Sequence, residues 1–187
     1  MKEETLPEAF LNGAKGYCEA ANLLLDQSSK IEANLLLRDP IYMLYLHATE
    51  LSLKAFIRYK GLKTGSLKTK FGHHLTGLHG QCIKGGLVIP KEFALDLVNV
   101  ISLLDSGNSD SAFRYWNPKS TVVPSLDWTK KVVIKLIELV ETYVPVGQKP
   151  GKAVKFIITA GKPESKKKRG AQVRVKKTGK GTSFQSY

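Results

Sequence analysis

Residues 39–59 form the segment that most restricts how this 187-residue chain can fold. Apolar side chains recur along two of its helical faces. They are Ile41, Leu44, Ala48, Leu51 and Ala55 on one face, and Tyr42, Leu46, Leu53, Phe56 and Ile57 on the other. A helix that is apolar on two sides must be packed on two sides, so the pattern predicts a central helix. Its expected start is the N-cap Asp39 followed by Pro40, and its expected end is Gly61.

Four other segments have the periodicity of helices with one apolar face: about 6–27, 74–84, 91–104 and 124–143. The stretch 60–72 contains three glycines and is predicted to be a polar loop. These segments together predict an all-α fold, an up-and-down bundle of about five helices over residues 1–146.

Prolines and glycines follow the last predicted helix, and residues 147–187 are predicted to form a basic, flexible tail. Segments 153–159 and 171–177 each have the pattern of a short strand. A lone hairpin is marginal in water, so the tail is expected to be largely irregular, or ordered only on a partner.

The charge of the chain is concentrated in this tail. Residues 149–187 contain twelve Lys or Arg and one acid, Glu164, for a net charge of +11, whereas residues 1–148 carry a net charge of +2. Such asymmetry is typical of an arm that binds a polyanion, although a lysine-rich run can also serve solubility alone. The candidate nucleic-acid-binding residues are Lys166, Lys167, Lys168, Arg169, Arg174, Lys176 and Lys177.

The two cysteines, Cys18 and Cys82, fall on apolar helical stripes and are expected to be buried thiols in a reducing compartment. Two cysteines and four histidines at these spacings make no zinc ligand set, so no metal is predicted. The charged N-terminus has no apolar run behind it, and no stretch is long enough for a membrane span. A cytoplasmic protein is therefore predicted.

A polar stripe interrupts the central helix. His47, Glu50, Lys54 and Arg58 are spaced by three, four and four residues, which places them on one side of a helix. The stripe is either a solvated edge stabilised by the Glu50–Lys54 pair or a polar groove on the bundle. His73, His74 and His79 follow in sequence, and a helix-capping or structural hydrogen-bonding role is expected for one of them.

A further candidate is the aromatic segment 113–118, in which Arg114 stands beside Phe113, Tyr115 and Trp116. These side chains suit either stacking on bases or packing over a helix end. No nucleophile–base arrangement, phosphate-binding glycine loop or dinucleotide motif is present in the sequence, so no catalytic residue and no cofactor are predicted.

Three short motifs resemble those of HEPN-domain proteins. Residues 48–55, Ala-Thr-Glu-Leu-Ser-Leu-Lys-Ala, are similar to the family's A-x-E-x-x-L-K-A helix. Residues 72–78 resemble its G-H-D-L-x-x-L element, with His74 in place of the Asp. Leu104-Asp105 followed by Arg114-Tyr115 resembles its L-D…R-Y piece. The resemblance covers about residues 6 to 144.

The resemblance implies a bundle of four or five helices that is commonly dimeric. It implies either an RNA-cutting toxin or defence nuclease, or a non-catalytic binding version. The family's nucleases carry an Arg and a His separated by four to six residues, and no arginine of this chain has a histidine at that spacing. The matched positions, expected to form one polar cluster, are Glu50, Lys54, His73, Arg114 and Tyr115.

The leading hypothesis from the sequence is therefore a non-catalytic HEPN-like module, a homodimer that binds RNA or DNA through its tail with low sequence preference. One alternative is a ribonuclease of toxin or defence type with an atypical site built on Glu50, His73 and Arg114. Another is a scaffold for a protein partner, such as a cognate antitoxin, without nucleic-acid binding.

Overall fold

The computed structural model describes residues 5–28, 34–109, 113 and 122–144. The chain divides into two units, residues 1–156 and 157–187, and all described residues belong to the first. These residues contain six helices and no strand. The helices are α1 (Pro7–Ser28), α2 (Asn34–Tyr59), α3 (Thr64–Phe71), α4 (Leu75–Lys84), α5 (Lys91–Ser109) and α6 (Leu126–Glu141). The all-α prediction is confirmed.

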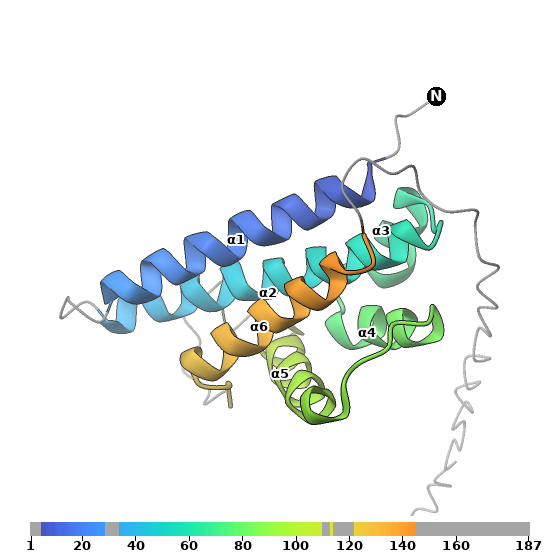
Figure 1. Ribbon diagram of the computed structural model, residues 1–187. Coiled ribbons are helices and arrows are strands. Elements are labelled where there is room, and N and C mark those ends of the chain that lie inside the picture. Colours follow the sequence, from blue (N-terminus) through green and yellow to red (C-terminus); the bar gives the residue numbers. More distant parts are fainter. Residues whose placement is uncertain (1–4, 29–33, 110–112, 114–121, 145–187) are drawn as a thin grey trace, which may run out of the picture. The chain divides into compact units, whose positions relative to one another are not determined.

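The predicted central helix is central in the fold. α2 packs against α1, α4, α5 and α6, and α1 lies alongside it (Figure 1). A glycine allows the two long helices to approach closely, because a Cβ at Gly13 would lie only 3.0 Å from Leu51 Cδ1. Both sides of α2 are buried, as its two apolar stripes predict.

The last helix follows its sequence signals. Ser125 is the N-cap of α6, and its hydroxyl accepts a hydrogen bond from the Trp128 backbone N–H at 3.3 Å. The apolar face of α6 is buried against α1, α2 and α5. Its buried residues are Thr129, Val132, Val133, Leu136, Ile137 and Val140.

The start of α2 differs from the prediction. The helix begins at Asn34, so Pro40 lies inside it and Asp39 is not its N-cap. Asp39 instead accepts a hydrogen bond from Arg38 Nε at 3.2 Å. The leucines at 35–37 are strong helix formers, and a proline in the second turn removes only one helical hydrogen bond.

The predicted loop 60–72 is also wrong, because it contains helix α3. Leu67, which is 1% exposed, anchors this two-turn helix in the core. Gly61 and Gly72, both with positive φ, turn the chain before and after it. A short helix with little periodicity of its own forms here because packing of Leu67 stabilises it.

α5 extends beyond its predicted end at residue 104 and reaches Ser109. Its last turn lies under the ring of Phe113, since a Cβ at Gly107 would come within 2.4 Å of that ring. Phe113 stacks on Tyr42 with ring centroids 5.2 Å apart, and the Tyr42 hydroxyl donates to the carbonyl of Pro124. Phe113 therefore packs over a helix end, the structural alternative given for the aromatic segment.

Both cysteines are buried and free, as predicted. Burial raises the pKa of the Cys18 thiol to about 11, and it raises the pKa of Cys82 as well. Thiols of this kind stay protonated at neutral pH and are poor nucleophiles. Among the described residues, no helix combines the length and the apolar character that crossing a membrane requires.

Candidate functional site: a buried carboxylate and its basic partners

The polar stripe of α2 surrounds one buried carboxylate. Glu50 is 2% exposed, and its Oε1 accepts a hydrogen bond from Lys54 Nζ, one turn further along the helix. The His73 Nδ1 lies 2.9 Å from Glu50 Oε2 and 3.1 Å from Oε1. The His47 Nδ1 lies 3.7 Å from Oε2. Glu50, Lys54, His73 and His47 are called the Glu50 cluster below.

Burial explains why this carboxylate has so many partners. An ionised carboxylate removed from water is costly unless it is paired and hydrogen-bonded. Lys54 is itself 9% exposed, so it also needs a partner in the protein. The pair satisfies both charges in place of water, and the helical spacing of four residues brings them together.

His73 connects the buried carboxylate to solvent. Its side chain is 60% exposed, although its Nδ1 is hydrogen-bonded to Glu50. An ionised carboxylate can only accept hydrogen bonds, so the Nδ1 is the donor in this contact. The Nε2, the other ring nitrogen, lies on the side of the ring away from this contact.

His47 is held from another helix. Its ring meets Tyr17 of α1 in an edge-to-face contact, with centroids 4.6 Å apart. α1 therefore fixes the second imidazole of the cluster. Its Nδ1, 3.7 Å from Glu50, lies beyond normal hydrogen-bond distance.

A second buried carboxylate holds the segment that carries His73. Asp105 of α5 is 7% exposed and accepts hydrogen bonds from the backbone N–H groups of Leu75 at 2.9 Å and Thr76 at 3.1 Å. The Thr76 hydroxyl also donates to it. Asp105 thus caps the N-terminus of α4 from another helix, where a negative charge is favourable. The turn 72–76 is fixed between Glu50 of α2 and Asp105 of α5.

The predicted structural role of a histidine is filled by His73, through its bond to Glu50. His74 occupies the N-cap position of α4, but its side chain makes no capping hydrogen bond. The exposed-edge interpretation of the polar stripe is wrong, because Glu50, Lys54 and Arg58 are all buried. Helical spacing places residues on one face without showing that α1 and the turn 72–76 cover that face.

Arg58 belongs to the stripe but not to the cluster. Its Nε donates to the carbonyl of Thr5 at 2.9 Å, and an Nη donates to the carbonyl of Leu62 at 3.4 Å. It therefore holds the chain before α1 and the turn after α2. Arginine suits such a position because its guanidinium presents several donors in a fixed plane.

Of the five residues predicted to form the polar cluster, Glu50, Lys54 and His73 lie together. Arg114 and Tyr115 lie outside the described residues, as do Trp116, the two candidate strands of the tail and the seven candidate nucleic-acid-binding residues. Sequence reasoning missed the capping role of Asp105. The sequence did contain a sign of this role, because Asp105 is an acidic residue that directly follows Leu104 on the apolar face of its helix.

The described side chains offer no group of three His, Cys, Asp or Glu residues that could hold a metal ion. In the Glu50 cluster, the Lys54 ammonium contacts the carboxylate directly. What the cluster can provide chemically is an oriented imidazole backed by a buried carboxylate.

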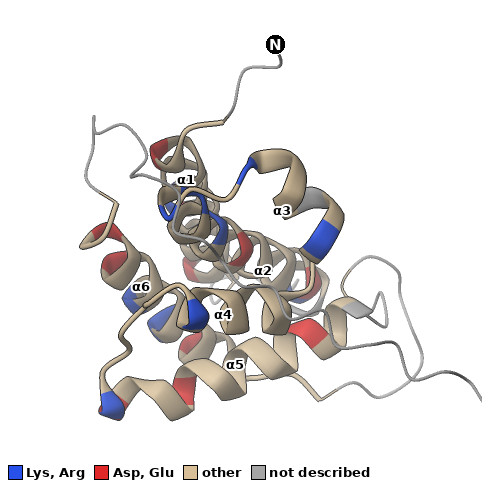
Figure 2. Cartoon of the chain, turned by 90° about the vertical axis from the view of Figure 1, so that its right-hand side faces the viewer, with Lys and Arg blue, Asp and Glu red and all other residues tan. Residues whose placement is uncertain are grey.

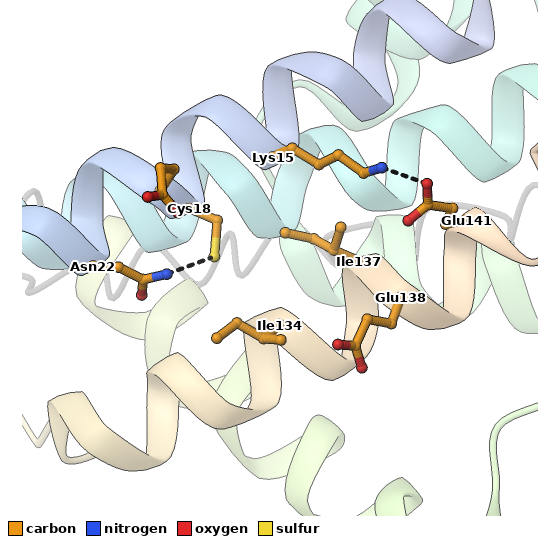
Figure 3. Close-up of a pocket in the computed structure, with 8 residues that line it drawn as sticks. Lys15, Cys18, Asn22, Ile134, Ile137, Glu138 and Glu141 are labelled. Atoms are coloured by element: carbon orange, nitrogen blue, oxygen red, sulfur yellow. Dashed lines mark hydrogen bonds and ion pairs between the residues drawn. The ribbon is translucent and has the colours of Figure 1, made fainter. Parts of the chain in front are cut away.

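A shallow groove of about 310 Å³ lies elsewhere, between α1 and α6 (Figure 3). Cys18, Ile134 and Ile137 give it an apolar floor, while Glu19, Glu138 and the Lys15–Glu141 pair stand at its rim. Its charged side chains are exposed, unlike Glu50.

No protein family model, no curated protein and no solved structure shows a significant match to this chain.

Proposed function

We propose that this protein is a non-catalytic binding module, a helical bundle of the HEPN type whose basic C-terminal segment contacts RNA or DNA. The observation that carries the proposal is the charge distribution. Residues 149–187 have a net charge of +11, whereas the 148 residues before them have a net charge of +2. A segment with this excess of Lys and Arg attracts phosphate backbones irrespective of base sequence.

The mechanism is the release of counterions from the nucleic acid. If the segment neutralised about six phosphates, the logarithm of the binding constant would fall with a slope near −5 against the logarithm of salt concentration. Low sequence preference follows, because contacts to phosphate carry no direct information about the bases.

The HEPN part of the proposal rests on the motif residues. It is supported by the contacts of Glu50, Lys54 and His73, which belong to two separate motifs of the resemblance and meet in one cluster. We further propose a cytoplasmic homodimer, since the resemblance implies a dimer and the two cysteines are free thiols.

The test uses the full chain with labelled single-stranded RNA and labelled duplex DNA, measured by fluorescence anisotropy across a salt series. A tail variant replaces Lys166, Lys167, Lys168 and Arg169 by Gln. A matched control replaces four lysines of α5 and α6 by Gln, namely Lys91, Lys130, Lys131 and Lys135. The tail variant is expected to bind more weakly and to lose roughly four from the salt slope, at about one for each lost phosphate contact.

Equal affinities and slopes for the tail variant, the control and the unsubstituted chain would contradict the proposal. A binding curve that does not respond to salt would exclude counterion release as the mechanism. Circular dichroism of each variant shows whether the helices are retained.

A second function is favoured by one contact, the 2.9 Å hydrogen bond between His73 Nδ1 and the buried Glu50. An exposed imidazole oriented by a carboxylate is an arrangement used for general acid–base catalysis. The alternative is a ribonuclease of toxin or defence type in which His73 moves a proton. It departs from the family's nucleases, which rely on the Arg…His pair that this sequence lacks.

Incubation of the purified chain with RNA, followed by gel analysis, tests this alternative. Cleavage that disappears in His73→Ala but persists in His74→Ala would establish it, since both side chains are exposed and only His73 contacts Glu50. Intact RNA in every sample supports the non-catalytic function.

A further inference from the structure

The first 148 residues are nearly neutral overall, but their charge is unevenly placed. Residues 51–91 contain eight Lys or Arg and no Asp or Glu. The remainder of residues 1–148 therefore carries a net charge of −6. The acid-free segment comprises the last third of α2, all of α3 and α4, and the first residue of α5.

Two of these basic residues are used inside the bundle and are not available to a ligand. Lys54 pairs with Glu50, and Arg58 donates to backbone carbonyls. Both are less than one-tenth exposed. The surface charge of the segment must come from the others.

Helix α3 displays that charge at the surface. Lys63 precedes its first residue and Lys70 lies in its last turn, and both are exposed. Lys60, just before them, is partly exposed and lies over the rings of Phe56 and Tyr59, at 5.3 and 5.8 Å from their centroids. In Figure 2, α3 and its flanks carry blue segments and no red one. Lys60, Lys63 and Lys70 are called the α3 surface below.

These lysines differ from other lysines of the bundle in their partners. Lys15 pairs with Glu141, and Lys130 pairs with Asp26. Within the described ranges, no carboxylate lies within ion-pair distance of any of the three lysines of the α3 surface. The buried acid nearest to them in sequence, Glu50, already contacts Lys54 and His73.

The α3 surface is also fixed in place. Leu67, in the middle of α3, is 1% exposed and anchors the helix in the core. Lys63 and Lys70 thus stand at opposite ends of an anchored helix.

We infer that the α3 surface is a second phosphate-binding surface for RNA or DNA, located on the bundle itself. The inference rests on the proposed function and adds a site within the folded domain. The exposed large apolar side chains of the described residues all lie outside residues 60–74. A protein interface has an apolar or aromatic core, whereas a nucleic-acid interface is polar and basic, so the surface fits nucleic acid better than an acidic protein.

The test compares three full-length variants in the salt series described above. The first is Lys63→Gln/Lys70→Gln. Its matched control, Lys131→Gln/Lys135→Gln, removes two exposed lysines of α6, outside the acid-free segment. The third is the tail variant. The α3 variant is expected to reduce the salt slope by about two and to weaken binding to all sequences alike, whereas the control changes neither.

The outcomes separate this inference from the proposed function. If the α3 variant binds like its control while the tail variant is weakened, the inference is wrong and the proposed function stands. If only the α3 variant is weakened, the inference stands and the tail loses its assigned role. If the unsubstituted chain binds neither nucleic acid, both fail. Displacement of RNA by poly-glutamate at equal charge concentration, with the same dependence on Lys63 and Lys70, would assign the surface to acidic proteins and overturn the inference.

Discussion

Two lysine–glutamate pairs in this bundle have the same chemistry and opposite surroundings. In the Glu50–Lys54 pair the side chains are 2% and 11% exposed, whereas in the Lys15–Glu141 pair they are 42% and 45% exposed. The first lies on the central helix under α1 and the turn 72–76. The second joins α1 to α6 beside the groove, open to water (Figure 3).

The difference in exposure determines how much each pair can contribute to the stability of the fold. An exposed pair gains little, because water screens the attraction and the two long side chains lose freedom. A buried pair loses the solvation of both ions, so it need not stabilise the fold more than two apolar residues would. Once buried, however, each ion depends on the other, and the loss of one leaves the other unpaired.

The buried pair also has a consequence that the exposed pair lacks. Glu50 fixes the exposed ring of His73, and Asp105 fixes the backbone just after it. The buried carboxylates therefore define the geometry of the turn 72–76, while the Lys15–Glu141 pair contacts no residue of the Glu50 cluster. The following substitutions test this contrast.

The largest effect is expected for Glu50→Ala. The change leaves the buried Lys54 ammonium without its carboxylate and releases His73. Breaking a buried ion pair by removing one partner costs about 3–5 kcal/mol in the free energy of unfolding. Urea denaturation followed by circular dichroism measures the loss, and a cost below about 1 kcal/mol would show that Glu50 is not buried as an ion.

A smaller loss is expected for Asp105→Ala. The backbone N–H groups of Leu75 and Thr76 lose their acceptor, and hydrogen bonds to a charged group contribute about 1.5–3 kcal/mol. Amide hydrogen exchange at residues 75 and 76 should accelerate. Asp96→Ala is the control, since Asp96 is exposed on the same helix. Equal stability of the two variants would contradict the capping role.

Lowering the pH should reduce the free energy of unfolding because of His79. The reduction should be smaller than that caused by Asp105→Ala. Burial lowers the pKa of this ring below its usual value of 6.5, so the unfolded chain takes up a proton more readily than the folded one. Stability is then fully present above pH 6.5 and falls as pH drops through 6.5 towards the folded pKa. Denaturation curves at pH 7.5 and 5.5 should differ less in His79→Gln than in the unsubstituted chain, and an equal difference in both proteins would contradict this origin.

The smallest effect is expected at the exposed pair. Glu141→Gln keeps the size of the side chain and removes the charge that faces Lys15. The free energy of unfolding should change by less than about 1 kcal/mol, and the change should shrink further in high salt. A loss comparable to that of Glu50→Ala would remove the contrast between the two regions.

The sequence by itself determined the features that depend on neighbouring residues. The helical class, the start of α6 after its N-cap Ser125 and the end of α4 at Lys84 follow from periodicity, caps and breakers within a few residues. The central position of α2 also followed from its own two apolar faces. The charge asymmetry of the chain is likewise a property of composition alone.

Only the tertiary structure decided which polar groups meet. His73 and Asp105 reach their partners across 23 and 30 residues of chain, and no local pattern encodes those pairings. The burial of Glu50, Lys54 and Arg58 depends on what covers one face of α2, and α3 is stable because Leu67 packs in the core. Helical periodicity shows which residues share a face of a helix. Whether that face is buried, and how much its burial stabilises the fold, depends on the helices and turns that pack against it.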